Sequence, residues 1–531
     1  MHDSISSHDL IVLLGILAAI GGLLALEPVL RVPYPILLVL GGLGLALIPG
    51  VPTLALPPDI VLLALLPPLL YSSAFFTSLR DLRANLRPIG LLAIGLVIAT
   101  TAVVAVVMHH VAGLPWASAV VLGAIVSPTD PVAANAIASR LGVPRRLIVI
   151  IEGESLVNDA SALVIYRVGI VAAIGGAFSM TDAGLRFVGA VTGGIAIGLL
   201  VGYIVYRLRR PLNNPRAEIA LSLMTAYFAY IPAELVGASA VIAAVTAGIY
   251  LGWHAPELMR PETRLQSLAV WEILVFLINA FLFALVGLQL PVVLDGLQGE
   301  SAGTLLGYAA AICATVIVVR FVWVFPATYL PRLMSRRLRE RDPYPPWQYP
   351  TLISWIGMRG AVTLAAALAV PQLTDAGDPF PGRNLIIFLA FCVILFTLVV
   401  QGLSLPGVIR MLGLESDSDA DREESLARIR AAEAAVDRLA ELEAEEWVRE
   451  DTAQRIRGLY SFRTSRFTAR LDATDDGTIE QRSLAYQRLR HELLNAEREA
   501  VVDMRRSGEI SDEVMNTVIR DLDLEDVRLD A

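Results

Sequence analysis

The sequence contains no lysine and only two cysteines among its 531 residues. All 42 basic residues are arginine, which fits a GC-rich coding genome and carries no information on mechanism. Both cysteines, Cys313 and Cys392, lie in apolar runs, which excludes a disulfide framework and a zinc site. The glycine patterns of nucleotide-binding loops are missing too. We therefore expect no ATP drive, no bound cofactor and no nucleic-acid partner.

Charge is also scarce, since only 18% of the residues are charged, whereas 55% are hydrophobic and the mean hydropathy is +0.63. Soluble proteins are about 45–50% apolar and rarely contain repeated apolar runs of about 20 residues, the length that spans a bilayer. This chain contains more than ten such runs. We therefore predict an all-α polytopic membrane protein whose main partner is the lipid bilayer.

Apolar runs bounded by proline, glycine and arginine predict thirteen transmembrane helices. Their expected ranges are 9–26, 33–49, 58–76, 88–112, 117–138, 147–175, 185–208, 216–235, 238–252, 268–290, 303–330, 350–371 and 384–411. Arginine-rich loops, such as the one with Arg80, Arg83 and Arg87, alternate with loops that hold almost no arginine. By the positive-inside rule the arginine-rich loops are cytoplasmic. We therefore predict that the N-terminus lies outside and the C-terminus inside.

Two of the predicted helices are interrupted. Pro128 and Pro131 break the run 117–138, because each lacks a backbone donor and obstructs a regular helix. The run 350–371 is broken at the sequence Gly-Met-Arg-Gly, residues 357–360. The two segments run in opposite directions in the predicted topology, which is typical of an inverted-repeat transporter with its site at the repeat interface. The sequence shows no residue-level repeat, so this prediction rests on topology alone.

The composition changes after residue 412. Residues 411–531 hold 30 acidic residues and 18 arginines, whereas the rest of the chain is slightly basic. Alanine, glutamate and arginine recur there with apolar residues at helical spacing, in two stretches separated by the polar sequence 472–477. We predict a membrane domain over residues 1–412 and an acidic cytoplasmic helical tail, a hairpin or short bundle, over residues 413–531. The ligand of the tail, and whether the tail regulates, stay open.

Carboxylates inside apolar segments mark the candidate site, because a carboxylate at bilayer depth costs roughly 2.5 kcal/mol or more. One polar face of a single predicted helix carries Glu154, Ser155, Asn158 and Asp159. Asp159 lies roughly 18 Å along that helix, near the middle of the membrane. We predict that Asp159 binds a proton or a cation, with Thr129 and Ser155 as oxygen ligands for Na⁺ and Asn158 as a nearby dipole. The alternative for Asp159 is a structural ion pair with a buried arginine.

A proton and a cation that compete for one carboxylate give exchange, because an empty charged site is too costly to move through the bilayer. Neither ion can leave unless the other replaces it. One carboxylate also implies one proton for each monovalent cation. The residues therefore predict electroneutral cation/proton antiport by a protein with no catalytic residues, with Na⁺ or K⁺ as the transported cation.

Two arginines at membrane depth need partners, because an unpaired guanidinium there would be costly. We predict a structural ion pair between Arg320 and Glu154. Arg359, at the second interruption, balances either Asp130 or the dipoles of the broken helix ends. Asp130 itself either caps the second half of its broken helix or contributes to the electrostatics of the ion site.

Five segments carry a family resemblance: LLPPLLYSSAF at 65–75, SPTDPVA at 127–133, EGESLVNDASAL at 152–163, FLFALVGLQL at 281–290 and GMRGAVTLA at 357–365. With them the chain resembles the monovalent cation:proton antiporter-1 family, the bacterial sodium/proton antiporters related to the animal sodium/proton exchangers. The segments recur in the family's order over residues 10–410. The Asn-Asp pair together with Thr-Asp-Pro is quite specific.

The resemblance implies thirteen helices, a homodimer made by one helical domain, and a moving core domain that carries the ion across a bacterial inner membrane. It implies that Asp159 is the ion- and proton-binding carboxylate, with Thr129 and Ser155 as ligands and Asn158 alongside. It also implies electroneutral one-to-one exchange. It assigns no defined activity to the tail.

The resemblance further implies an ion pair between Glu154 and Arg320. One position departs from the family, because many bacterial members have glutamate where this chain has Ser73. The departure puts in doubt any role in pH gating or ion attraction assigned to that glutamate. It also weakens a choice between Na⁺ and K⁺ by analogy.

Sodium/proton antiport is the leading prediction, and potassium/proton antiport by the same chemistry is its close rival. A membrane-embedded aspartyl protease that uses Asp130 and Asp159 would be a different class, but the prolines around Asp130 and the lack of a Gly-x-Gly-Asp sequence argue against it. A cation channel stays open as a third class. Antiport saturates and needs a counter-gradient, whereas a channel carries net current.

Overall fold

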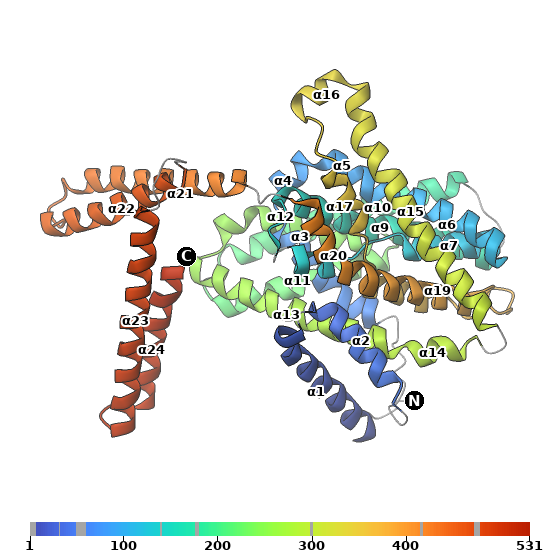
Figure 1. Ribbon diagram of the computed structural model, residues 1–531, viewed down its shortest axis with the longest axis horizontal. Coiled ribbons are helices and arrows are strands. Elements are labelled where there is room, and N and C mark those ends of the chain that lie inside the picture. Colours follow the sequence, from blue (N-terminus) through green and yellow to red (C-terminus); the bar gives the residue numbers. More distant parts are fainter. Residues whose placement is uncertain are drawn as a thin grey trace. The chain divides into compact units, whose positions relative to one another are not determined.

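The computed structural model describes residues 7–30, 32–48, 60–138, 141–175, 180–297, 301–414, 418–471 and 478–530. The chain divides into two compact units, Met1–Ser416 and Asp417–Ala531. Throughout the described ranges the regular structure is helical (Figure 1), and one isolated bridge between Leu373 and Pro379 is the only strand-like pairing there. The all-α prediction is confirmed.

Unit 1 holds the apolar helices. In chain order it begins with α1 (Ser7–Leu30), α2 (Tyr34–Ala46), the π-helical turn η1 (Ile60–Leu65), α3 (Leu66–Phe76), α4 (Leu79–Ala84), α5 (Leu86–Gly90), the π-helical turn η2 (Leu91–Leu96), α6 (Val97–Ala112), α7 (Trp116–Val126), α8 (Val132–Ala138), α9 (Arg145–Gly175) and α10 (Met180–Arg209). It continues with α11 (Pro215–Leu235), α12 (Ala240–Leu258), α13 (Pro261–Leu288), α14 (Leu290–Asp295), α15 (Ala302–Met334), α16 (Arg336–Arg341), α17 (Gln348–Trp355), α18 (Ala361–Leu368), α19 (Arg383–Phe396), the π-helical turn η4 (Thr397–Gln401) and α20 (Gly402–Leu412).

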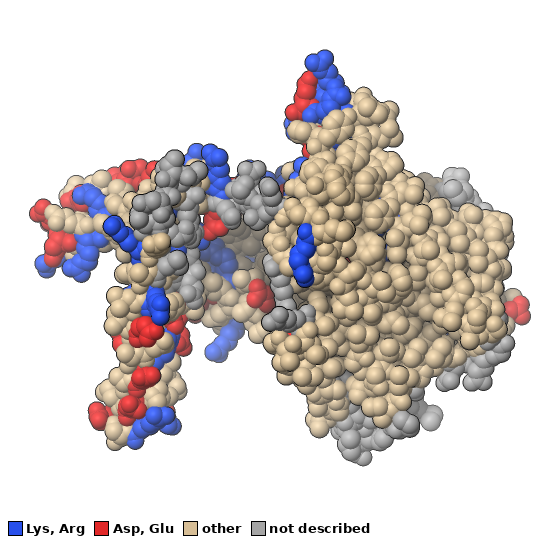
Figure 2. All heavy atoms as spheres, viewed as in Figure 1, with Lys and Arg blue, Asp and Glu red and all other residues tan. Residues whose placement is uncertain are grey.

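By length and composition, six helical stretches of the described residues can cross a membrane. They are Leu86–Ala112, Arg145–Gly175, Gly184–Arg209, Pro261–Leu288, Ala302–Met334 and Arg383–Leu412. Four apolar helices are shorter: Ala18–Leu30, Tyr34–Ala46, Val61–Phe76 and Trp116–Val126. Figure 2 shows a face of this unit that is almost free of charge, while charged side chains gather over α16. These helices identify a multi-pass membrane protein, as predicted.

The helices of unit 1 pack in two groups. In the first, α10 lies along α12, α12 lies along α3, and α13 lies along α2 (Figure 1). Small residues of α10 allow this packing, because a Cβ at Gly194 would overlap the carbonyl oxygen of Ser239, the N-cap of α12, and a Cβ at Gly198 would overlap that of Ala243 within α12. In the second group, α7 packs against α6 and α9, and α15 packs against α6 and α17. The helix interruptions belong to the second group.

Both interruptions occur where the sequence predicts them. Helix α7 ends at Val126 and α8 begins at Val132, so that the residues between them include Pro128 and Pro131. Helix α17 ends at Trp355 and α18 begins at Ala361. The two breaks meet, because the backbone N–H of Asp130 donates a hydrogen bond to the carbonyl oxygen of Met358 at 2.8 Å. Four helix ends are thereby brought to one place inside the unit.

Unit 2 consists of two helical hairpins. Helix α21 (Ser418–Leu442) packs against α22 (Glu450–Leu471), and α23 (Thr478–Ser507) packs against α24 (Asp512–Asp530). Each hairpin is held by ion pairs, which are Arg457–Glu443 in the first and Arg498 with Asp523 and Asp526 in the second. Gly508 forms the second turn with φ of +81°, a conformation that glycine adopts readily.

Candidate functional site

The ends of the broken helices carry opposite partial charges, and the chain places a charged side chain at each kind of end. The C-terminal end of α7 exposes carbonyl groups, and the buried Arg359 lies against them. Its Nε donates a hydrogen bond to the carbonyl oxygen of Val126 at 3.0 Å, and its Nη1 donates to that of Gly357. In the described residues no ion pair joins Arg359 to Asp130, so of the two partners considered for Arg359 the structure provides the helix end.

Asp130 lies at the opposite kind of helix end. Its Oδ1 accepts a hydrogen bond from the backbone N–H of Val132 at 2.9 Å, where α8 begins. Its Oδ2 lies so close to Gly360, the residue before α18, that a Cβ at Gly360 would overlap the carboxylate. Asp130 therefore caps one half-helix and faces the start of the other, which agrees with both roles considered for it.

Glu154 and Arg320 form a buried ion pair. Arg320 Nη1 and Nη2 lie 2.5 Å and 2.8 Å from the two carboxylate oxygens of Glu154, and both side chains are 2% exposed. Arg320 Nε also donates to the carbonyl oxygen of Ile353 at 3.0 Å. The pair thus joins α9 and α15 to α17, and charge-assisted bonds of this bidentate kind are among the strongest side-chain hydrogen bonds.

A short chain of hydrogen bonds leads from this pair toward Asp159. The hydroxyl of Thr129 donates to Glu154 Oε1 at 3.1 Å, and Asn158 Nδ2 donates to Thr129 Oγ1 at 3.1 Å. These bonds orient two neutral oxygens. Asn158 Oδ1 is buried and has no hydrogen-bond partner among the described residues, and Thr129 Oγ1 keeps one lone pair.

Asp159 lies at the buried end of a cavity of about 470 Å³. Its side chain is 8% exposed, and among the described residues no group forms a hydrogen bond or ion pair with its carboxylate. Thr129, Asp130 and Ser155 line the same cavity, whereas Asn158 lies behind Thr129. The structure therefore brings the predicted ion-site residues together. It provides no arginine partner for Asp159 within the described ranges.

The cavity has a second wall that our sequence analysis missed. Helices α3 and α13 supply Ser72, Ser73, Trp271, Glu272 and Asn279 to it. The signal for Glu272 is its charge inside an apolar helix. The stripe of lining residues at 268, 271, 272, 275, 279 and 282 has helical spacing, so one face of α13 borders the cavity.

Glu152 also lines the cavity. Its Oε1 accepts a hydrogen bond from Asn135 Nδ2 at 2.8 Å, and the residue is half-buried. The carboxylates that line the cavity therefore differ in their hydrogen bonds and in their exposure. Glu152 and Asp130 are hydrogen-bonded, Glu272 is exposed, and Asp159 is buried without a partner among the described residues.

Comparisons with known proteins agree with this arrangement. The fold is similar to that of the sodium proton antiporter MjNhaP1 from Methanocaldococcus jannaschii, with a TM-score of 0.61 and 19% identity over 78% of this chain and 100% of that chain. An uncharacterized Na⁺/H⁺ exchanger of Mycobacterium bovis is 39% identical over 528 residues, 98% of this chain and 96% of that protein. A sodium, potassium, lithium and rubidium/H⁺ antiporter of Bacillus pumilus is 34% identical over 389 residues, 71% of this chain and 57% of that protein.

The family assignment follows from the sequence match and the helical architecture together. Residues 15–410 match the family described as "Sodium/hydrogen exchanger, transmembrane", a range that contains both helix interruptions, the Glu154–Arg320 pair and the cavity at Asp159. The chain belongs to the sodium/hydrogen exchanger family, within the monovalent cation:proton antiporter-1 group of membrane transporters.

Proposed function

We propose that the chain is an electroneutral Na⁺/H⁺ antiporter that exchanges one Na⁺ for one proton at Asp159 by alternating access. The observation that carries this proposal is the contrast among the buried acids. Glu154 is bound to Arg320, and Asp130 accepts a bond from Val132, whereas Asp159 has no partner among the described residues and faces the cavity. A buried carboxylate needs a counter-charge or a proton, and a transported ion supplies one or the other.

The surrounding oxygens suit a cation in this position. Ser155 lines the cavity beside Asp159. Thr129 is held by its hydrogen bond to Glu154, and Asn158 is held by its hydrogen bond to Thr129. Hard cations favour such oxygen ligands. Glu154 and Arg320 compensate each other, and Asp130 and Arg359 are compensated by helix ends. The ion bound at Asp159 therefore sets the net charge of the helix group that moves. Either Na⁺ or a proton on Asp159 leaves that charge the same, which makes exchange electroneutral.

The cavity also indicates which state of the cycle the structure represents. It extends to Thr77 at the end of α3 and to Leu268 in the first half of α13. Arg80 follows in the short helix α4, and Arg264 lies in the first turn of α13. Arginines at these helix ends are assigned to the cytoplasm by the positive-inside rule. We infer an inward-facing state of a thirteen-helix, inverted-repeat protein in the bacterial inner membrane, with the N-terminus outside and the tail inside.

The two compact units of the chain support separate functions for the two parts. We propose that residues 1–412 carry transport, that a homodimer forms through the first helix group, and that residues 413–531 are a cytoplasmic tail with a regulatory role. The site residues all lie in unit 1. The two hairpins of unit 2 are acidic and rich in exposed side chains, as expected for a part that lies in water.

Potassium is the second candidate cation. The relative from Bacillus pumilus is named for sodium, potassium, lithium and rubidium, so similar sequences accommodate larger cations. In this chain the far wall of the cavity carries Ser73, a neutral residue, and the ligands beside Asp159 are all neutral oxygens. An aspartyl protease is disfavoured, because Asp130, the other aspartate that lines the cavity among the described residues, is committed to the helix ends.

Proton flux in proteoliposomes tests the proposal. The full chain is reconstituted with a pH-sensitive dye inside, and Na⁺, K⁺ or Li⁺ is added outside. We expect saturable, Na⁺-triggered proton flux in the wild type and in the Glu272→Gln variant, which neutralises an exposed acid on the opposite wall. We expect no flux in Asp159→Asn, which keeps the shape of the side chain and loses its titration.

Each outcome has a distinct meaning. A response to K⁺ alone would keep the mechanism and change the cation. Flux that persists in Asp159→Asn would place the ion site elsewhere, and Asp130→Asn would be the next variant to measure. Net current without a counter-ion would indicate a channel instead.

A further inference from the structure

Three arginines from three helices of unit 1 converge on one carboxylate. Asp342, in the segment between α16 and α17, is bonded to Arg87 Nη2 at 2.8 Å, to Arg146 Nη2 at 2.9 Å and to Arg332 Nη2 at 2.6 Å. Burial would raise the pKa of Asp342, but the hydrogen bonds from Arg146 and Arg332 outweigh it and hold the pKa below its usual range. The carboxylate is therefore ionised at neutral pH and supplies one negative charge against three positive ones.

The remaining donors of this cluster are only partly satisfied. Arg146 Nε donates to Asn85 at 3.2 Å, and Arg332 donates to the carbonyl oxygens of Asp342 and Thr328. Arg87 Nε and Nη1, in contrast, are buried and have no hydrogen-bond partner among the described residues. Two buried guanidinium nitrogens without a partner and an excess of two positive charges are both features that an anion would compensate.

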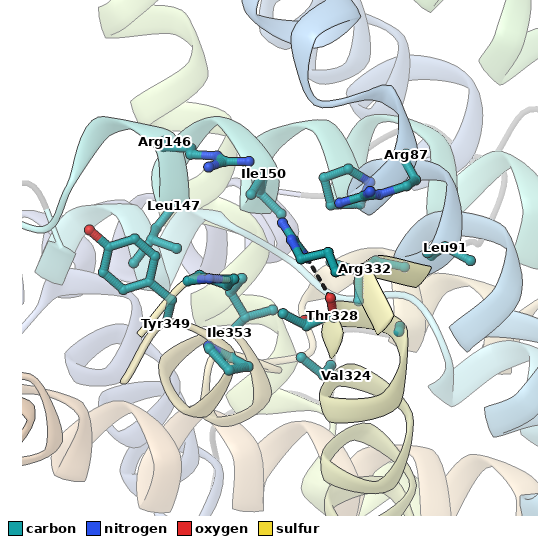
Figure 3. Close-up of a pocket in the computed structure, with 15 residues that line it drawn as sticks. Arg87, Leu91, Arg146, Leu147, Ile150, Val324, Thr328, Arg332, Tyr349 and Ile353 are labelled. Carbon is teal, nitrogen blue, oxygen red and sulfur yellow. Dashed lines mark hydrogen bonds between the residues drawn. The ribbon is translucent and has the colours of Figure 1, made fainter. Parts of the chain in front are cut away.

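A pocket lies directly beside these arginines. Figure 3 shows Arg87, Arg146 and Arg332 at its edge, with Leu147 and Ile353 among the apolar residues that form its walls. Its volume of about 50 Å³ is well above the roughly 10–15 Å³ that a cavity needs to hold one water molecule, so it has room for a small polar guest. Arg146 and Arg87 are 44% and 28% exposed, so the pocket is reachable from solvent.

We propose that this pocket binds a phosphate group, carried either by an anionic lipid of the adjacent leaflet or by inorganic phosphate. Guanidinium groups match the geometry of phosphate oxygens and bind them in pairs. The anion would share the cluster with Asp342, which neutralises only part of its charge. The lipid source rests on the cytoplasmic orientation proposed above, since anionic lipids concentrate in that leaflet, whereas the binding itself does not.

The bound group would join the helices that hold the ion site. Arg146 lies in the first turn of α9, which carries Glu154 and Asp159, and Arg332 lies near the end of α15, which carries Arg320. Tyr349 of α17 lines the same pocket. Phosphate at this position would therefore link α9, α15 and α17 at one end of the second helix group. We expect this link to raise the thermal stability of unit 1.

The test measures binding to the full chain in nanodiscs, with the unfolding midpoint as the readout. One arm uses phosphatidylcholine nanodiscs and adds inorganic phosphate at constant ionic strength against chloride. The other arm replaces part of the phosphatidylcholine by phosphatidylglycerol. Arg146→Gln removes one guanidinium of the cluster. Arg145→Gln is the matched control, because Arg145 is its exposed neighbour and bonds to Asp81 instead of Asp342.

We expect phosphate, phosphatidylglycerol or both to raise the midpoint of the wild type and of Arg145→Gln. In Arg146→Gln the apparent affinity should fall about tenfold or more, the value of one lost charge-assisted bond. In Asp342→Asn, the anion should bind more tightly than in the wild type and restore stability, because its competitor has been removed. The arm that responds identifies the source of the phosphate.

Two results would overturn the proposal. The first is a midpoint that neither phosphate nor phosphatidylglycerol changes in the wild type. The second is an equal shift in Arg146→Gln and Arg145→Gln, which would reduce the effect to non-specific surface charge. The unfolding midpoint does not depend on ion transport, so neither result would contradict the proposed antiport.

Discussion

At the scale of single residues, the charges that hold the structure are separate from the carboxylate that we propose to exchange ions. Arg359 is bound to carbonyl groups at a helix end, and Glu154 is bound to Arg320. Both guanidinium groups are therefore compensated without Asp159. A carboxylate left out of this compensation can gain and lose a proton or a cation without disturbing the fold.

Glu154→Gln should destabilise the protein without removing the ion-binding carboxylate. The change leaves Arg320, which is 2% exposed, without its counter-charge. Removing one partner of a buried pair costs about 3–5 kcal/mol. Thermal unfolding in detergent should show a clearly lower midpoint and a lower yield of folded protein. The double variant Glu154→Gln/Arg320→Met should recover part of the loss. A single variant as stable as the wild type would contradict the structural role of the pair.

At the residue scale, a contact could be predicted from the sequence where a buried charge requires a partner. It could not be predicted where the contact depends on how a helix is rotated about its axis. Arg320 lies deep in an apolar run, so a partner was required, and Glu154 was the acid available in the neighbouring polar segment. For Arg359 two kinds of partner were equally consistent with the sequence, and only the path of the chain shows carbonyl groups beside it. Asn279 and Glu272 were missed because the orientation of α13 toward the cavity depends on packing with α2 and α3.

At the scale of elements, the crossing of the two broken helices depends on one close approach. Gly360 lies against Asp130, and an added Cβ would overlap the carboxylate. Gly360→Ala should therefore cost about 1–3 kcal/mol through overpacking, or shift Asp130 and lower the exchange rate. Gly307→Ala in α15 is the control, because a Cβ there meets nothing within 4 Å. Equal thermal stability and equal flux in both variants would contradict this account of the crossing.

An exposed ion pair connects α9 of the second helix group to α11, which packs against α10 and α12 of the first group. Arg167 of α9 lies 2.7 Å from Glu234 of α11, and both are partly exposed. If the groups move against each other, this pair breaks during the cycle. An exposed pair contributes roughly 0.2–1 kcal/mol, so Glu234→Gln should reduce the inward-facing population by at most about fivefold.

Thiol labelling measures that population. A cysteine at Ser73, which lines the cavity, should react with an impermeant reagent from the cytoplasmic side and react more slowly when Glu234→Gln is added. Glu340→Gln is the matched control, since the Arg336–Glu340 pair lies within one helix, α16. Unchanged labelling in Glu234→Gln would show that the pair does not bias the equilibrium.

The positions of the breaks could be predicted because proline and glycine act locally. Pro128 and Pro131 prevent a continuous helix whatever surrounds them. The contact between the two breaks, from Asp130 to Met358, joins residues far apart in the chain and follows from the packing of α7 with α18. No local pattern encodes that contact, and for the same reason the cavity between the helix groups was not predicted.

At the scale of the whole molecule, we propose one ion site in a membrane unit that alternates its access. The chain belongs to the sodium/hydrogen exchanger family over residues 15–410, and the candidate site lies within that range. One titratable group that serves both ions would fix the stoichiometry. Because either ion neutralises Asp159 equally, the membrane voltage should not enter the driving force.

The null point of exchange tests this claim most directly. Proteoliposomes with a fixed Na⁺ gradient are given a series of opposing pH gradients, and the pH gradient at which proton flux stops is recorded at several clamped voltages. We predict that flux stops when the ratio of the Na⁺ concentrations equals the ratio of the proton concentrations, at every voltage. A null point that moves with voltage would mean unequal numbers of charges in the two directions and would contradict exchange at a single carboxylate.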